Sequence, residues 1–220
     1  MIDTIPLFPL SHGVFPDGML PLQIFEPRYL DLIKRCHRDQ KPFGVVWLLR
    51  GREVQTPGDE PEFGKVGCLV HIRTCTEVQP ALLRIVCQGG LRFELVKSKP
   101  GPYGVWQGEV KYLPADPEAA LPTEFQPHAD RLGQAIAQAQ QQGMGDRLPW
   151  FAPYRLDDCG WLANRYAEAL PLAPALGLGL KRIEGDWTQR RLYLALRDQN
   201  QLSSAARAFV GLMPWVPKAI

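Results

Sequence analysis

The spacing of apolar residues changes once along this chain, near residue 120. From residue 2 to about residue 113, apolar side chains recur mostly at every second position, which is how a β-strand presents one buried face. After residue 122 they recur at every third or fourth position, as on an amphipathic helix. We therefore predict an α+β fold in which a β-rich lobe (1–115) is joined by a proline-rich connector (116–122) to a bundle of helices (123–220).

A pair of glycines, Gly89 and Gly90, separates two apolar runs in the first lobe. Two glycines can supply the positive φ angles that a two-residue hairpin turn requires, so we predict strands over 82–88 and 91–96 joined by this turn. Further strands are predicted over 45–49, 66–72 and 105–113. The Pro- and Gly-rich stretch 50–64 shows no periodicity and is predicted to be a surface loop.

One helix is predicted within the β-rich lobe, from Pro27 to Arg38, because proline at the first helical position loses no hydrogen bond. Later helices are predicted over 126–142, from Asp157 or Asp158 to Leu170, and from Asp186 onward, where the carboxylates can cap free amides. The first helix is predicted to carry an inward stripe of Tyr29, Leu32, Ile33 and Cys36. The later helices place, in chain order, the following sets at helical spacing: Ala129, Leu132, Ile136 and Ala139; Cys159, Leu162, Tyr166 and Ala169 on one side; and Trp187, Arg191, Leu194 and Asp198 along successive turns.

Charge and cysteine content narrow the class of protein. The net charge is +2 with acidic and basic residues interspersed, so general binding to nucleic acid is not favoured. The first basic residue is Arg28, and no apolar run reaches the roughly 20 residues of a membrane-spanning helix, so neither export nor a membrane segment is expected. The five cysteines are an odd number scattered among apolar neighbours, which favours reduced thiols in a cytoplasm.

Several separated motifs resemble the N-terminal, substrate-binding domain of Lon proteases. The opening IPLFPL (5–10), the helix entry FEPRY (25–29) and the strand FGVV (43–46) look like the start of that domain, and GLRF (90–93) is similar to its glycine, arginine and aromatic motif. The later segments ALPL (169–172), KRIE (181–184) and RL (191–192) follow in the same order as its late helical motifs. Their order and spacing carry the resemblance more than any single motif does.

The resemblance implies a pseudobarrel similar to RNA-binding PUA-like domains, followed by helices, and a role in recognising polypeptides. The sequence has no Gly-x-x-x-x-Gly-Lys-Ser/Thr stretch to hold phosphates and no segment like the peptidase module of the full-length protease. We therefore expect a non-enzymatic, free-standing polypeptide-binding or adaptor protein without catalytic residues, cofactors or metals. Its expected partners are unfolded or extended polypeptides, with a protease or a chaperone as a further candidate.

The candidate polypeptide-binding residues surround two local features. Phe15, Pro16 and Met19 flank the turn signal Asp17-Gly18, where apolar side chains beside an exposed turn can form an adaptable patch. Glu26 and Arg28 flank Pro27 at the helix entry, where their charges can either meet a passing peptide or fix the corner. Core packing and helix capping are the competing structural interpretations, and we weight them more heavily.

Three alternative functions stay open. An RNA-binding barrel would use Arg73, Arg84, Arg92 and Trp106, while Arg92 also suits a buried ion pair. A zinc site at Cys68, His71 and Cys75 is disfavoured, because Cys68 points opposite to the other two on a strand. A small hydrolase would need one of the four dispersed histidines, His12, His37, His71 and His128, near a nucleophile, which has little support.

The end of the chain is more apolar than an idle terminus. After Asn200 it carries Phe209, Leu212, Met213, Trp215 and Val216. We expect this tail to pack on its own domain or on a partner.

Overall fold

The structure is a computed structural model that describes residues 2–53, 60–145 and 148–168, all of which fall within one compact unit. Its strands are β1 (Asp3–Leu10), β2 (Met19–Ile24), β3 (Phe43–Arg50), β4 (Glu62–Gln79), β5 (Leu82–Pro100) and β6 (Trp106–Tyr112). Its helices are α1 (Pro27–Asp39), α2 (Gln126–Gln141) and α3 (Cys159–Glu168), with short 3-10 turns η1 (Pro102–Gly104) and η2 (Thr123–Phe125). The strands thus come first, and α2 and α3 follow them.

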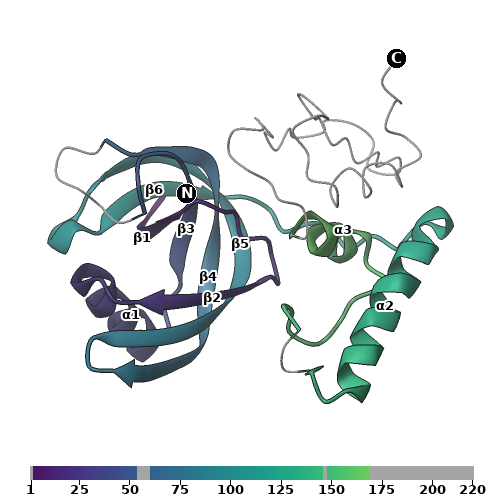
Figure 1. Ribbon diagram of the computed structural model, residues 1–220. Coiled ribbons are helices and arrows are strands. Elements are labelled where there is room, and N and C mark those ends of the chain that lie inside the picture. Colours follow the sequence, from purple (N-terminus) through teal and green to yellow (C-terminus); the bar gives the residue numbers. More distant parts are fainter. Residues whose placement is uncertain (1, 54–59, 146–147, 169–220) are drawn as a thin grey trace. The chain divides into compact units, whose positions relative to one another are not determined.

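The six strands form one sheet that closes on itself (Figure 1). β1 pairs in parallel with β3 and antiparallel with β6, while β4 pairs antiparallel with both β3 and β5. The long strand β5 completes the ring, because its second half pairs with β6 and its first half carries β2 as an additional strand. The pairings therefore make a small barrel. Its likeness to RNA-binding PUA-like barrels stays an expectation.

Because successive side chains of a strand point to opposite faces of the sheet, the apolar residues divide between two cores. In β1, Ile5 and Leu7 lie in one core, while Phe8 and Leu10 lie in the other. The first core also holds Val46, Leu69, Phe93 and Val110. The second core receives the buried face of α1, together with residues of β2, β3 and the first half of β5. Both faces of β1 are therefore buried, and its apolar residues run almost continuously from Ile5 to Leu10.

The predicted helix at Pro27 is confirmed. α1 starts with proline in its first turn, and the residue that caps its C-terminus, Gln40, adopts the left-handed conformation, with φ 52°. All four residues of the predicted stripe are buried, and Leu30 is buried beside them. This helix covers the sheet at the second core.

The predicted hairpin turn at Gly89-Gly90 is wrong. Both glycines lie inside the continuous strand β5, and neither has a positive φ. The turn between β4 and β5 is instead Pro80-Ala81, flanked by the pair Gln79 and Leu82, with Ala81 at φ 65°. A side chain at position 89 would collide with the carbonyl oxygen of Phe15, so the glycine serves close backbone contact within a strand and does not form a turn.

The helices predicted over 126–142 and from Asp158 are confirmed as α2 and α3. The amide of Trp161 donates to Asp158 Oδ1 at 2.8 Å, which is the expected capping bond. The predicted stripe of the second of these helices is wrong in part, because α3 buries Trp161, Leu162 and Arg165, whereas Cys159 and Tyr166 are only partly buried. Arg165 is buried although only its Nη2 has printed hydrogen-bond partners, Pro16 O and Glu168 Oε1, as described below.

Several predictions lie outside the described residues. They are the helix beginning at Asp186, the apolar tail after Asn200, the late motifs from residue 169 onward and the middle of the loop at 54–59. The proposed lobe boundaries at 115 and 122 stay a prediction. Among the helices that the structure describes, none is long and apolar enough to cross a membrane.

Candidate functional site

The predicted turn at Asp17 is present and is attached to β5. The amide of Gly18 donates to Phe15 O at 3.0 Å, and Asp17 has φ 62°, as the third position of a type II turn requires. Asp17 N donates to Gly89 O and Gly89 N donates to Gly18 O, each at 2.9 Å. Phe15, Pro16 and Met19 are all half-buried, so the turn leaves part of each predicted contact residue exposed.

The same turn holds the helical segment. Pro16 O accepts a hydrogen bond from Arg165 Nη2 at 2.6 Å, and the Asp17 carboxylate pairs with Arg155 Nη2 at 2.5 Å. Gly18 also forms an isolated β-bridge with Trp150. The turn therefore connects the barrel to α3 and to the segment before it, which local sequence analysis does not reveal.

Arg165 and Glu168 form a partly buried ion pair next to this connection. Arg165 Nη2 donates to Glu168 Oε1 at 2.9 Å, and Trp150 Nε1 donates to Glu168 Oε2 at 3.0 Å. The Arg165 side chain is fully buried, and its Nε and Nη1 have no protein partner. Burial raises the pKa of Glu168 to about 7, although Arg165 and the Trp150 bond both oppose the shift. Burial likewise lowers the pKa of Arg165.

Glu26 and Arg28 fix a different corner of the barrel. Arg28 Nε donates to Glu26 Oε2 at 2.9 Å, and Arg28 Nη1 donates to Gly104 O at 3.0 Å. The Arg28 guanidinium also lies over the ring of Tyr29, 4.5 Å from its centroid, and the side chain is only 11% exposed. These contacts favour the structural interpretation of this pair over peptide contact.

The five predicted contact residues do not meet at one place. The six residues of β2 separate the turn at Asp17 from Glu26, which at about 3.3 Å per residue is roughly 20 Å. Phe15, Pro16 and Met19 thus lie at one end of β2, and Glu26 and Arg28 lie beyond the other. A single small site does not contain both groups.

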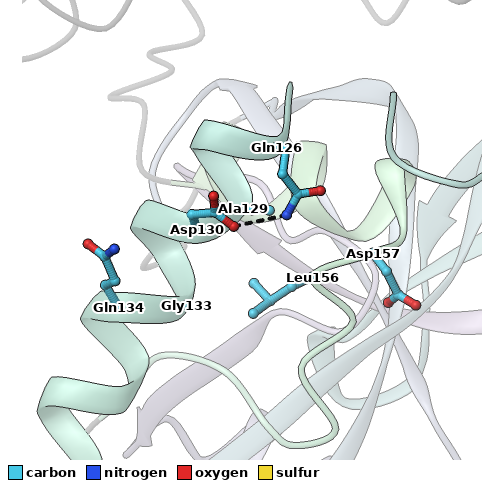
Figure 2. Close-up of a pocket in the computed structure, with 7 residues that line it drawn as sticks. All are labelled: Gln126, Ala129, Asp130, Gly133, Gln134, Leu156 and Asp157. Carbon is cyan, nitrogen blue, oxygen red and sulfur yellow. Dashed lines mark hydrogen bonds between the residues drawn. The ribbon is translucent and has the colours of Figure 1, made fainter. Parts of the chain in front are cut away.

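A groove of about 430 Å³ lies between α2 and the segment around Leu156 (Figure 2). It is lined by Gln126, Ala129, Asp130, Gly133, Gln134, Leu156 and Asp157. Leu156 points toward α2, where a Cβ at Gly133 would stand 3.0 Å from Leu156 Cδ1. Arg155, which pairs with Asp17 of the turn, directly precedes the two groove-lining residues Leu156 and Asp157 in the sequence.

Sequence analysis missed the groove and the partly buried ion pair. Ala129 was predicted at helical spacing on this helix, but the groove needs the segment at 156–157 to lie against α2, and no local pattern specifies that contact. The sequence does contain a weak signal that Arg165 lies on the buried face of its helix. Arg165 follows Trp161 by four positions and Leu162 by three, so it shares their face of the helix, and Glu168 follows three positions later.

The residues considered for other functions are mostly engaged elsewhere. Arg73 Nε donates to Gln88 Oε1 at 2.7 Å, Arg92 forms an ion pair with Asp116, and Trp106 packs edge-on against Phe63. Buried Cys68 contacts Gly90 O at 3.4 Å, whereas His71 is exposed. Among the described residues, no group of three or more His, Cys, Asp or Glu is placed to hold a metal ion.

The fold and the groove define a class: a small closed β-barrel covered by one helix, followed by a short helical segment that carries an open groove. Residues 4–184 match the family model described as the ATP-dependent protease La (LON) substrate-binding domain. The chain belongs to this family, and the resemblance found in the sequence is confirmed.

Solved and curated relatives agree with this family. The crystal structure of a Lon N-terminal domain protein from Xanthomonas campestris is similar with a TM-score of 0.58 and 27% identity, covering 80% of this chain and 88% of that one. A Lon protease of Anaeromyxobacter dehalogenans (strain 2CP-C) is 33% identical over 101 residues, and Lon protease 2 of Myxococcus xanthus is 35% identical over 97 residues. These matches cover 44% and 43% of this chain but only 12% and 11% of the two relatives.

Proposed function

We propose that this chain recognises extended or partly unfolded polypeptides and acts as a non-enzymatic binding module. The observation that carries the proposal is the family match over residues 4–184, because the matched family is a substrate-binding domain. A protease or a chaperone that receives the bound polypeptide is the partner we propose. Cys36, Cys68, Cys75 and Cys87 are free thiols, which supports a reducing compartment such as the cytoplasm.

The proposed binding surface comprises the turn residues Phe15, Pro16 and Met19 and the groove beside Leu156. Three half-buried apolar residues and a groove with an apolar floor suit a polypeptide whose own apolar side chains are exposed. The Arg155–Asp17 ion pair links the two parts. Glu26 and Arg28 were predicted in the same role, but we assign them to the corner at the start of α1.

The direct test is a fluorescence anisotropy titration at about 150 mM salt. The probe is labelled ribonuclease A, reduced and alkylated with iodoacetamide so that it stays unfolded without gaining charge. We expect saturable binding of this probe and weaker binding of native ribonuclease A. An absence of binding to the unfolded probe would reject the proposal. A labelled single-stranded RNA provides the comparison for the RNA-binding alternative, and its affinity would fall steeply with salt.

Variants locate the surface. Phe15→Ala, Met19→Ala and Leu156→Ala are each expected to weaken binding about fivefold or more, because apolar anchors commonly contribute over 1 kcal/mol. Phe25→Ala and Leu91→Ala are matched controls, since both side chains are exposed elsewhere on the barrel. Equal effects of control and test variants would place the binding surface elsewhere while leaving the proposed function intact.

A further inference from the structure

One strand of the sheet has a neighbour on one side only. Among the strands that the structure describes, β2 comes last in the order of the sheet and pairs with β5 alone, because the ring closes between β5 and β6 without it. Its pairing with β5 runs over six consecutive residues without a register shift. The other side of β2 is therefore a regular edge that lies outside the ring.

Alternate residues of β2 turn their backbone groups to this free edge. Gly89 N donates to Gly18 O at 2.9 Å, so the carbonyl group of Gly18 faces β5. Hydrogen-bonded and non-bonded pairs alternate along an antiparallel ladder, so every second residue after Gly18 also faces β5. The residues between them, Met19, Pro21 and Gln23, face the free edge. Pro21 agrees with this assignment, because a proline at such a position removes no bond from the ladder.

The free edge already pairs with another part of the chain at its start. Gly18, which bonds to Gly89 on one side, forms an isolated antiparallel bridge with Trp150. Because a residue of a sheet has one pairing partner on each side, Trp150 lies at the free edge. No described strand pairs with the edge beyond this bridge, and the side chains of Pro21 and Gln23 are exposed there. The edge therefore accepts an antiparallel backbone.

The second half of β4 has an unpaired side as well, but it is less regular. From Ile72 to Gln79, β4 pairs with β5 only. Register shifts interrupt this pairing between Ile72 and Thr74 and between Glu77 and Gln79. Bulges of this kind bend a strand and hinder further pairing at its edge. Of these two edges, the edge of β2 is thus better suited to receive an added strand.

Pro21 determines which occupant suits the edge of β2. A proline on an edge strand hinders pairing between copies of a protein, and in a pair of two β2 strands both edges would lack the donor at position 21. An unrelated extended segment keeps its own amides. It can donate to the carbonyl oxygens of Pro21 and Gln23 and can accept from the amide of Gln23.

We infer that an extended segment of the captured polypeptide adds to the free edge of β2 as an antiparallel strand and is held by backbone hydrogen bonds. The inference rests on the proposed polypeptide-binding function and adds a mode of recognition to it. β2 begins at Met19, next to the half-buried Phe15 and Pro16, so the apolar contacts of the turn continue into the edge. Backbone groups are the same in every sequence, which suits a module that receives many unfolded chains.

The test uses three labelled nine-residue peptides with identical side chains, in which valine alternates with serine. One peptide is unmodified, one carries N-methyl groups on its odd-numbered inner residues, and one carries them on its even-numbered inner residues. Each is titrated against the full chain. Alternate amides of a strand point to opposite edges, so we expect one methylated peptide to bind like the unmodified peptide. The other is expected to bind at least about tenfold more weakly, because it loses several donors.

Variants of β2 test the same edge from the side of the protein. Pro21→Val supplies the missing amide and is expected to tighten binding of the unmodified peptide about threefold to tenfold, as one hydrogen bond would give. Gln23→Val is the matched control, because it places the same side chain on the same face of β2 without adding an amide. Gln23→Pro removes an outward amide and is expected to weaken binding by a similar factor. Circular dichroism verifies that each variant is folded.

The outcomes separate the inference from the proposed function. Equal binding of the two methylated peptides, or equal affinities of Pro21→Val and Gln23→Val, would overturn the inference. If the unmodified peptide does not bind but unfolded ribonuclease A does, the inference fails and the proposed function stands, whereas binding of neither rejects both. Self-association of Pro21→Val in analytical ultracentrifugation, without a gain in peptide affinity, would assign the edge to pairing between copies and would also overturn the inference.

Discussion

The backbone of Gly89 in β5 lies directly against the carbonyl oxygen of Phe15, so closely that no side chain fits between them. Two backbone hydrogen bonds of 2.9 Å, from Asp17 N to Gly89 O and from Gly89 N to Gly18 O, depend on this approach. The same turn binds Arg155 and Arg165. The contact at Gly89 therefore supports both the barrel and the connection to α3.

Gly89→Ala is expected to lower the free energy of unfolding by about 2 kcal/mol, because the added methyl group displaces the Phe15 backbone. Gly90→Ala is the matched control. There the new Cβ would stand 3.2 Å from the exposed His71 ring, which can move, so a change within about 0.5 kcal/mol is expected. Urea denaturation followed by circular dichroism measures the free energy of unfolding of both variants. Equal stability of the two variants would contradict the proposed role of Gly89.

Glu168 is expected to make stability depend on pH. Its pKa in the folded protein is about 7, above the ordinary value of 4.5, so between these values the folded state binds more protons than the unfolded state. Stability therefore falls as pH rises across this window and levels off above pH 7. We expect the parent to lose about 2 kcal/mol relative to Glu168→Gln between pH 5 and pH 8.

Urea denaturation of both proteins at pH 5, 6, 7 and 8 measures this difference. Using the difference removes the contributions of other titrating groups. A constant offset between the two proteins over this range would show that Glu168 does not titrate there.

Asp158 caps the first turn of α3, since Trp161 N donates to its Oδ1. Asp158→Ala is expected to cost about 1 kcal/mol of stability, because this amide loses its acceptor. Asp158→Asn keeps an acceptor oxygen and is expected to cost much less. Thermal denaturation distinguishes the two, and an equal loss for both would point to the charge of Asp158 and not to the capping bond.

The cysteines are expected to react with iodoacetamide in two groups. Burial raises the pKa of Cys68 and of Cys87 to about 12, so at pH 8 roughly one thiol in ten thousand is ionised. Cys36 is also buried, whereas Cys75 and Cys159 are partly exposed. Mass spectrometry of the native protein should find Cys75 and Cys159 modified first, and urea should remove the difference. Fast native modification of Cys68 would contradict its buried position.

Features set by neighbouring residues were predictable from the sequence. Pro27 and the stripe that follows it specify α1, Asp158 specifies the start of α3, and Asp17-Gly18 specifies a turn. Each depends on contacts within a few positions. The family could also be recognised, because the order of several motifs survives along the chain.

Features set by distant contacts were not predictable. A glycine pair can permit a turn or can permit close approach of another backbone, and only the position of Phe15 decides which of these occurs at Gly89. Arg165 looks like a surface residue until Pro16 O and Glu168 are placed around it. The groove likewise requires Leu156 to lie against Gly133. Local periodicity gives a weak signal for Arg165 and Glu168, which share one face of α3, and no information about the other pairings.

The pairing of β1 with β6 has a consequence for synthesis of the protein. Asp3 lies opposite Val110 and Leu7 lies opposite Trp106, so β1, the first strand of the barrel, must wait for β6, the last of the six described strands, before the ring can close. A nascent chain that has just emerged from the ribosome would hold β1 with one open edge during this interval. Contacts of such long sequence separation form slowly, and an unpaired strand edge can pair with another chain until the ring closes.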